Sequence, residues 1–441
     1  MELKIDNTVK RFIVNLIFAI YWMTILDGML RKWLFPKHSN VIFFMKDPVV
    51  IFTYILALKY HLFPTKNRVF ILGMALAAIF LLLIFVQAVF LKLNPLVLIY
   101  GWRMYFLYIP IVFIIGNIFE KSDLDRLMKQ TLLAAIPIGI LVYMQFLSPM
   151  NAFINKAMDP VSKIYYVVSG IVRTSGTFTF YQGQVLFTAS AIAFIFYAWI
   201  SKRNERFIGP FSLICASYAV IACFALSGSR AVFFNMALIF FAAESCVVLL
   251  KSRESKTRTA LIPIMIVFLG AFVFTMFFNT SLAAILERQI VAVGIEGQTS
   301  DRLTNQFSDF AKYLLSHPIG AGVGIGTTGG GFLQNGSPVE IFNAGVRDIE
   351  WSRIVLESGP IAGLSFVIFR IILVFSLLIQ AMTATRRSGD TLPMILMGFI
   401  GIILLIGEIT NHGTINSYAW LFAGFCMAAN KIGADRSVCA Y

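Results

Sequence analysis

The chain has 441 residues, of which 59% are hydrophobic and only 13% are charged, and its net charge is +14. These few polar side chains cannot cover the surface of a soluble globule, so the composition excludes that class. Nucleic-acid binding is not indicated, because the basic residues are scattered between apolar runs and are not concentrated in one polar domain. The five cysteines indicate neither a disulfide framework nor a metal cluster.

The apolar runs predict membrane-spanning helices. Each run approaches about 20 residues, the length that a helix needs to cross a bilayer core of about 30 Å. We expect an all-α polytopic integral membrane protein with about 12 transmembrane helices, forming a single domain over residues 1–441. The first run lacks a cleavage site and is read as an uncleaved span. The expected spans are 12–30, 47–63, 69–91, 96–118, 130–147, 184–200, 209–227, 231–250, 260–278, 354–380, 391–410 and 414–430.

The distribution of lysine and arginine predicts the topology. Basic residues concentrate near both termini and in alternate connecting segments, including 59–68, 121–129 and 251–258. The positive-inside rule places this side in the cytoplasm, so both termini are expected there. The long polar segment between spans 9 and 10, residues 280–353, is then an extracytoplasmic loop.

The segment after the first span breaks this rule, since it carries Arg31, Lys32, Lys37 and Lys46 on the outer side. One interpretation is that these side chains contact lipid headgroups at a helix end. The other is that they contribute to an outward-facing anionic site.

Two further outward-facing segments carry an arginine. Arg173 begins the sequence RTSGTFTFYQGQ, and Arg230 follows the small-residue turn Ser227–Ser229 at the start of a span. Hydroxyls and amides at a helix N-terminus can hold a phosphate, and a guanidinium adds a bidentate donor pair. The alternative for Arg230 is a helix-end arginine that contacts headgroups.

The long loop contains a predicted amphipathic helix, 300–315, and a glycine tract, 320–331. Arg302 falls in the first turn of that helix, where a cation is unfavourable, so we expect an anionic partner such as Asp301 or a pyrophosphate. The tract contains a formal GxGxxG, but no strand precedes it, so a dinucleotide site is not predicted. Its glycines are expected to allow tight turns and a close approach of the backbone to a ligand or another helix.

Carboxylates and arginines alternate at the end of the loop. In a helix, Arg347 with Glu350 and Arg353 with Glu357 would form a structural salt-bridge ladder. The functional alternative is that one carboxylate acts as a general base. His317 is equally open between capping a helix end and taking part in chemistry.

Ionisable residues inside spans require partners in lipid. Arg103, Glu244 and Arg370 lie in predicted spans, and Glu244 with Arg370 is the candidate buried pair. Sequence motifs for metal, ATP or acyl-serine chemistry are lacking, so none of these is predicted.

Several short motifs resemble one family when taken in order. SGSRAVFFNMALIFF, then DRL and HPIGAGVG in the long loop, then RIVLESGPIAGL, together resemble the O-antigen ligase and O-antigen polymerase superfamily. These are membrane glycosyltransferases of the bacterial envelope. RTSGTF is similar to a segment that often precedes the sixth span of such proteins. DGMLRKWLFP and KDPVV look like a subgroup of polysaccharide polymerases.

The resemblance implies inverting transfer of a glycan from an undecaprenyl diphosphate carrier to an acceptor hydroxyl, on the outer face of the bacterial inner membrane, with no metal or other cofactor. Arg230 and Arg302, joined by the outward-facing Arg173 and Arg347, are then expected to bind the diphosphate. The position of the ligase histidine is occupied by Asp348, which favours a polymerase with Asp348 or Glu350 as the base.

The implied partners are the lipid-linked donor, the glycan acceptor, membrane lipids and other polysaccharide-assembly proteins. Alternatives are a ligase that transfers finished polysaccharide to a lipid acceptor, a transporter of lipid-linked oligosaccharide, and a noncatalytic assembly subunit. The absence of hydropathy symmetry between the two halves of the sequence argues against a transporter.

Overall fold

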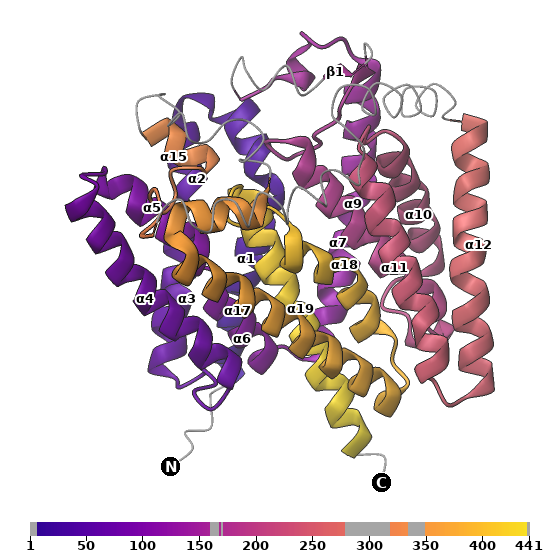
Figure 1. The fold of residues 1–441 in the computed structure, drawn as a ribbon. Coiled ribbons are helices and arrows are strands. Elements are labelled where there is room, and N and C mark those ends of the chain that lie inside the picture. Colours follow the sequence, from indigo (N-terminus) through magenta and orange to yellow (C-terminus); the bar gives the residue numbers. More distant parts are fainter. Residues whose placement is uncertain (1–6, 159–166, 169–170, 278–317, 334–348, 439–441) are drawn as a thin grey trace.

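The computed structural model describes residues 7–158, 167–168, 171–277, 318–333 and 349–438, which are almost entirely helical (Figure 1). Within these ranges, one antiparallel pair of short strands, β1 and β2, precedes α9. The elements of the first half are α1 (Asn7–Met29), η1 (Leu30–Leu34), η2 (Pro36–His38), α2 (Ser39–Phe44), α3 (Lys46–Lys59), α4 (Arg68–Phe90), α5 (Pro95–Phe106), α6 (Ile109–Ile118), α7 (Lys121–Leu147), η3 (Phe153–Asn155), β1 (Val167–Val168), β2 (Ile171–Val172) and α9 (Tyr181–Ile200). Those of the second half are η4 (Arg203–Glu205), α10 (Pro210–Ala225), α11 (Arg230–Leu249), α12 (Arg253–Phe277), α15 (Thr328–Leu333), α17 (Glu350–Ser388), α18 (Leu392–Ile406) and α19 (Gly413–Val438).

The prediction of a multi-pass helical membrane protein is confirmed. Among the described residues, 9 helical segments are long and apolar enough to cross a membrane, and α10 and α18 are shorter apolar helices. The helix α19 also coincides with a predicted span, although it is less apolar. The count of 12 and the sidedness of the loops stay predictions.

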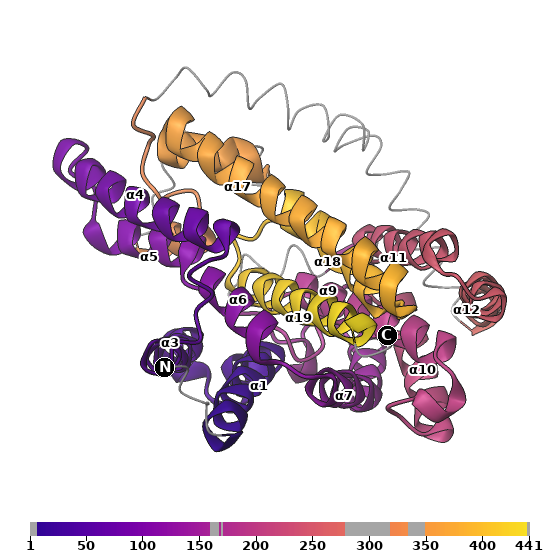
Figure 2. The same ribbon diagram turned by 90° about the horizontal axis from the view of Figure 1, so that it is seen from below.

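Small residues allow the central helices to approach closely. A Cβ atom at Gly116 of α6 would lie 2.5 Å from Met427 Cγ of α19, and one at Gly424 of α19 would lie 2.8 Å from Ile115 Cβ. This is how helices commonly associate in lipid, where packing replaces the hydrophobic effect between helices. Seen from below, α4 and α12 lie at opposite edges of the assembly, with α6, α9 and α19 between them (Figure 2).

The two ends of the bundle differ. The helix α1 begins and α19 ends at the same end, while α2, α15 and the strand pair lie at the other (Figure 1). This second end, called here the loop end, carries every described candidate site residue.

The helix α17 folds back on itself at Gly359. This glycine has φ 79° and ψ 169°, and Pro360 follows it. The positive φ favours glycine, and proline cannot continue the preceding hydrogen bonds. Glu350 and Arg370 would be about 30 Å apart in a straight helix, yet their side chains lie 2.9 Å apart. The predicted span 354–380 therefore contains a reversal that brings its polar first turns against its membrane-crossing part.

Candidate functional site

The glycine tract is held by one buried carboxylate. Glu357 accepts hydrogen bonds from the backbone amides of Gly324 (3.1 Å) and Gly326 (3.0 Å) and from the Tyr105 hydroxyl (2.8 Å). Its partner Arg353 lies 3.2 Å away, and neither side chain is exposed to solvent. The predicted pairing of Arg353 with Glu357 is thus confirmed, and it supports a loop as well as a helix.

The glycines permit a close backbone contact, as predicted. A Cβ atom at Gly101 of α5 would lie 2.5 Å from the carbonyl of Val323, and Gly324 has φ +90°. The Gln87 side chain donates to the carbonyls of Ile319 (2.7 Å) and Glu357 (2.9 Å). The described part of the tract is therefore a fixed loop packed on α4 and α5.

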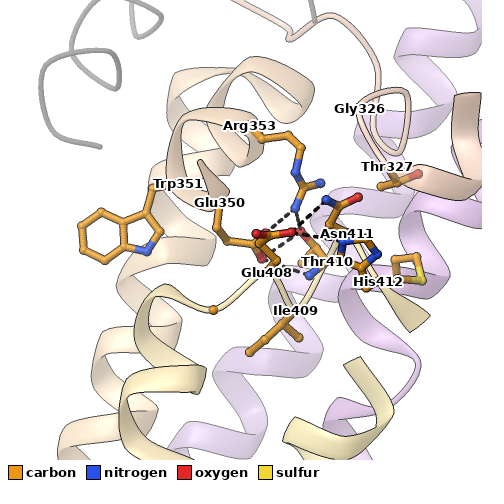
Figure 3. Close-up of polar contacts among 12 residues, drawn as sticks. Gly326, Thr327, Glu350, Trp351, Arg353, Glu408, Ile409, Thr410, Asn411 and His412 are labelled. Atoms are coloured by element: carbon orange, nitrogen blue, oxygen red, sulfur yellow. Dashed lines mark hydrogen bonds and ion pairs between the residues drawn. The ribbon is translucent and has the colours of Figure 1, made fainter. Parts of the chain in front are cut away.

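Glu350 lies at the centre of a second buried network (Figure 3). It pairs with Arg353 and with Arg370 (2.9 Å), and accepts from the amide (3.0 Å) and hydroxyl (3.1 Å) of Thr410. Its side chain is fully buried. A general base must reach the proton that it removes, so this environment favours a structural and electrostatic role, although a catalytic role for Glu350 stays a prediction.

One predicted pair is wrong. Arg370 binds Glu350 and the carbonyls of Leu404 (2.7 Å) and Gly407 (2.9 Å), whereas Glu244 Oε1 makes no hydrogen bond within the described part of the chain. The reason is the reversal at Gly359, which supplies a carboxylate to Arg370 from its own helix.

The sequence reasoning missed a histidine at the loop end. His412, immediately before α19, places Nε2 3.2 Å from Glu408 Oε2, and its side chain is 27% exposed. Asn411 also donates to Glu408, at 3.2 Å, and the Thr328 hydroxyl lies 3.4 Å from His412 Nδ1. Figure 3 shows this group beside the Glu350 network. The signal in the sequence was a glutamate and a histidine four residues apart where two predicted spans meet.

The contact with His412 determines the protonation state of Glu408. Burial acts to raise its pKa, but the hydrogen bond and the charge of His412, helped by Arg353 and Asn411, outweigh burial and hold the pKa of Glu408 below its usual value. Glu408 is therefore an anion at neutral pH and can orient the imidazole of His412 through their 3.2 Å contact.

Two of the predicted arginine segments are brought together. The Thr174 hydroxyl donates to the Leu226 carbonyl at 2.9 Å, which ties the RTSGTF segment to the end of α10. A Cβ atom at Gly228, in the turn before α11, would lie 3.4 Å from Arg173 Cγ. Arg230 is the first residue of α11, in that same turn. Arg173 therefore packs against the turn that presents Arg230.

The Arg173 segment is rigidly supported. The Gln145 side chain accepts from the amides of Ser175 (3.2 Å) and Gly176 (2.8 Å), and Met29 donates to the Thr177 carbonyl at 2.8 Å. The guanidinium lies 4.7 Å above the Tyr181 ring, and the side chain is only 5% exposed.

Aromatic rings connect the arginines with the histidine. Tyr181 lies against Phe180, with ring centroids 4.6 Å apart, and Phe180 stacks on His412 at 6.3 Å and an interplanar angle of 19°. The loop end thus combines the supported guanidinium of Arg173 with a partly exposed imidazole that is bonded to a carboxylate.

The remaining predicted site residues, Arg302, Arg347 and Asp348, lie outside the described residues, as does His317. No cluster of His, Cys, Asp and Glu suited to a metal ion occurs in the described ranges. A comparison with protein-family models and with curated proteins found no match.

Proposed function

We propose that this chain is a membrane glycosyltransferase that polymerises a cell-surface polysaccharide. It would transfer a glycan from an undecaprenyl diphosphate carrier to an acceptor hydroxyl on the outer face of the inner membrane. The observation that supports this best is the packing of Arg173 against the turn that carries Arg230, at the loop end of a membrane bundle.

Such a pair suits a diphosphate leaving group. Guanidinium groups form paired hydrogen bonds with phosphate oxygens. Arginines that are already fixed stabilise the developing charge without reorganising during the reaction. Arg173 meets this condition because Tyr181 and the bonded RTSGTF backbone hold it in place. Arg302 and Arg347 of the long loop are expected to complete the diphosphate site.

His412 is the described residue that best fits the base. When Nε2–H donates to Glu408, Nδ1 keeps a lone pair, on the side where the exposed Thr328 supplies a hydroxyl. The acceptor O–H would give its proton to Nδ1 while its oxygen attacks the anomeric carbon. The bond from that carbon to the diphosphate oxygen breaks, and the diphosphate leaves with the electron pair. Asp348 remains the alternative base in the long loop.

Lipid-linked intermediates in a deletion strain test the function. Polymerase activity predicts that single repeat units accumulate on the carrier. Finished polymer on the carrier would indicate a ligase, intermediates trapped on the cytoplasmic face would indicate a transporter, and unchanged intermediates would indicate a noncatalytic subunit. Each of these three results contradicts the proposal.

Arginine replacements test the diphosphate site. Arg173→Lys and Arg230→Lys keep the charge but remove the bidentate geometry, so polymer formation should collapse at unchanged protein level. Arg203→Lys, in an exposed segment at the other end of the bundle, is the matched control. Full activity of both lysine variants would show that the two arginines do not bind the diphosphate and only contact lipid headgroups.

A histidine replacement tests the base. His412→Asn should slow transfer by about 10²-fold to 10⁴-fold, the usual contribution of a general base, while binding of the lipid-linked donor is kept. The exposed His38, also at the loop end, provides the control His38→Asn. An unchanged transfer rate in His412→Asn would return the base role to Asp348.

A further inference from the structure

A group of cations at the ends of α1 and α3 takes no part in the proposed transfer. Arg31, Lys32 and Lys46 surround Asp27, and these four residues are called here the Asp27 cluster. Arg31 lies 3.4 Å from Asp27, and Asp27 also attracts the ammonium groups of Lys32 and Lys46 electrostatically. They come from the DGMLRKWLFP and KDPVV motifs, which are far from the arginines of the proposed diphosphate site in the sequence.

With its three basic side chains protonated, the cluster would carry more positive than negative charge. The neighbouring Asp47 is matched by Arg103, which binds it through two nitrogens at 2.5 and 2.8 Å. Among the described residues, Asp27 then remains as the main carboxylate for the three cations, and Asp47 adds a smaller attraction to Lys46. Within the described part of the chain, neither lysine lies in ion-pair distance of a carboxylate.

Both lysines are buried, and each ammonium has one hydrogen-bond acceptor among the described residues, with the Trp33 ring 4.9 Å from that of Lys32. Lys32 is 1% exposed and Lys46 is 4% exposed. The ammonium of Lys32 donates to the Ser175 hydroxyl at 2.8 Å, and that of Lys46 donates to the Ser417 hydroxyl at 3.3 Å. An ammonium carries three donors, and a buried cation without a counter-ion is strongly disfavoured. An anion at this place would use the remaining donors and balance the charge.

The cluster extends toward both the Arg173 segment and His412, and Lys32 donates to Ser175, two residues after Arg173. Arg31 and Arg103 place their guanidinium carbons 5.1 and 5.2 Å from the centre of the Phe43 ring. A Cβ atom at Gly413, next to His412 in the chain, would lie 3.1 Å from that ring. His412 itself stacks on Phe180, which leads to Arg173. His412 is therefore linked through neighbouring rings to both cation groups, and only one of them is needed for the donor diphosphate.

We propose that Arg31, Lys32 and Lys46 bind an anionic oxygen group, a carboxylate or a phosphate, carried by the acceptor glycan. Arg31 is the most exposed of the three, with 14% of its side chain exposed, and would contact the anionic group from the surface. The two buried lysines would neutralise the charge of that group. The site would select acidic acceptors and place their hydroxyl beside His412. The assignment of the anion to a glycan rests on the proposed function, whereas the binding of an anion does not.

Calorimetric titration of the full-length protein in phosphatidylcholine nanodiscs tests the site without donor or turnover. The probes are glucuronate, glucose 6-phosphate and glucose at matched ionic strength. We expect the two acidic sugars to bind and glucose to fail. Lys46→Met should weaken binding of the acidic sugars about tenfold or more, as for loss of a hydrogen bond to a charged group. Lys32→Met should act in the same direction.

Lys37→Met is the matched control, because Lys37 is exposed on the same segment and should leave binding unchanged. Methionine removes a buried charge without leaving a cavity, so melting temperatures without ligand should not fall. Equal binding of glucose, or unchanged binding in both buried-lysine variants, would overturn the proposal. The same conclusion would follow if the protein in nanodiscs that contain phosphatidylglycerol lost its binding of acidic sugars in a way that depends on Lys46. The ligand would then be a lipid headgroup. Failure of the proposed function would appear separately, in the intermediates of the deletion strain.

Discussion

Replacing Glu357 by glutamine tests whether one carboxylate holds the glycine tract against the bundle. The substitution keeps the size of the side chain and removes its charge. One oxygen becomes an NH₂ group and faces donors in either orientation, because Oε1 accepts from Gly326 and Arg353 while Oε2 accepts from Gly324 and Tyr105. Glu357→Gln therefore creates a donor–donor conflict in a fully buried place.

The expected loss follows from these contacts. Removing one partner of a buried ion pair typically costs about 3 to 5 kcal/mol. Arg353 keeps Glu350 as a partner, so we expect the lower part of this range, about 3 kcal/mol. The control is Glu254→Gln, which removes a 2.8 Å ion pair with Arg258 in which the carboxylate is 65% exposed. Such exposed pairs contribute at most about 1 kcal/mol.

Equilibrium unfolding in mixed detergent micelles measures the free energy of both variants, and limited proteolysis reports on release of the tract. Glu357→Gln should lower the free energy of unfolding and expose residues 318–333 to protease, while Glu254→Gln should resemble the wild type. Equal stability and equal protease resistance of the two variants would refute the carboxylate as the holder of the loop.

Three further predictions concern other parts of the molecule. Gly101→Ala should displace the tract, because its Cβ would lie 2.5 Å from the Val323 carbonyl; protease sensitivity at 318–333 measures this, and wild-type resistance would contradict it. The pKa of Glu408 is lower in the folded protein than the ordinary glutamate value of about 4.3. The ionised carboxylate therefore stabilises the fold at pH values above about 4.3, and this stabilisation is lost as the pH falls through the lowered pKa. The difference in melting temperature between wild type and Glu408→Gln should therefore shrink at acid pH, and a constant difference would refute the coupling. In a cysteine-free background, Ser255→Cys and Thr328→Cys should be labelled from opposite sides of the membrane, and labelling from one side would overturn the topology.

Hydropathy and local spacing were sufficient for the helices and for contacts within them. The predicted spans fall on described helices, because an apolar run of sufficient length has few alternatives in lipid. The span 96–118 is divided into α5 and α6, and the span 354–380 contains the reversal at Gly359. The pair of Arg353 and Glu357 followed from i,i+4 spacing alone, and the glycine tract was expected to allow close backbone contact. Glu408 and His412 are also four residues apart, but they lie in the connection between α18 and α19, and this pair was overlooked.

Contacts between distant segments were decided by the tertiary structure. Arg370 was assigned to Glu244, but the reversal at Gly359 brings Glu350 to it. The periodicity of the sequence does not show that α17 reverses at Gly359, so it cannot show which carboxylate reaches Arg370. Helix propensity and lipid solvation act on local segments and do not determine tertiary contacts. Packing joined Arg173 to the turn before Arg230. It also brought Lys46 to Asp27, which Arg31 already reaches through i,i+4 spacing, because a buried charge finds distant partners only when the helices assemble.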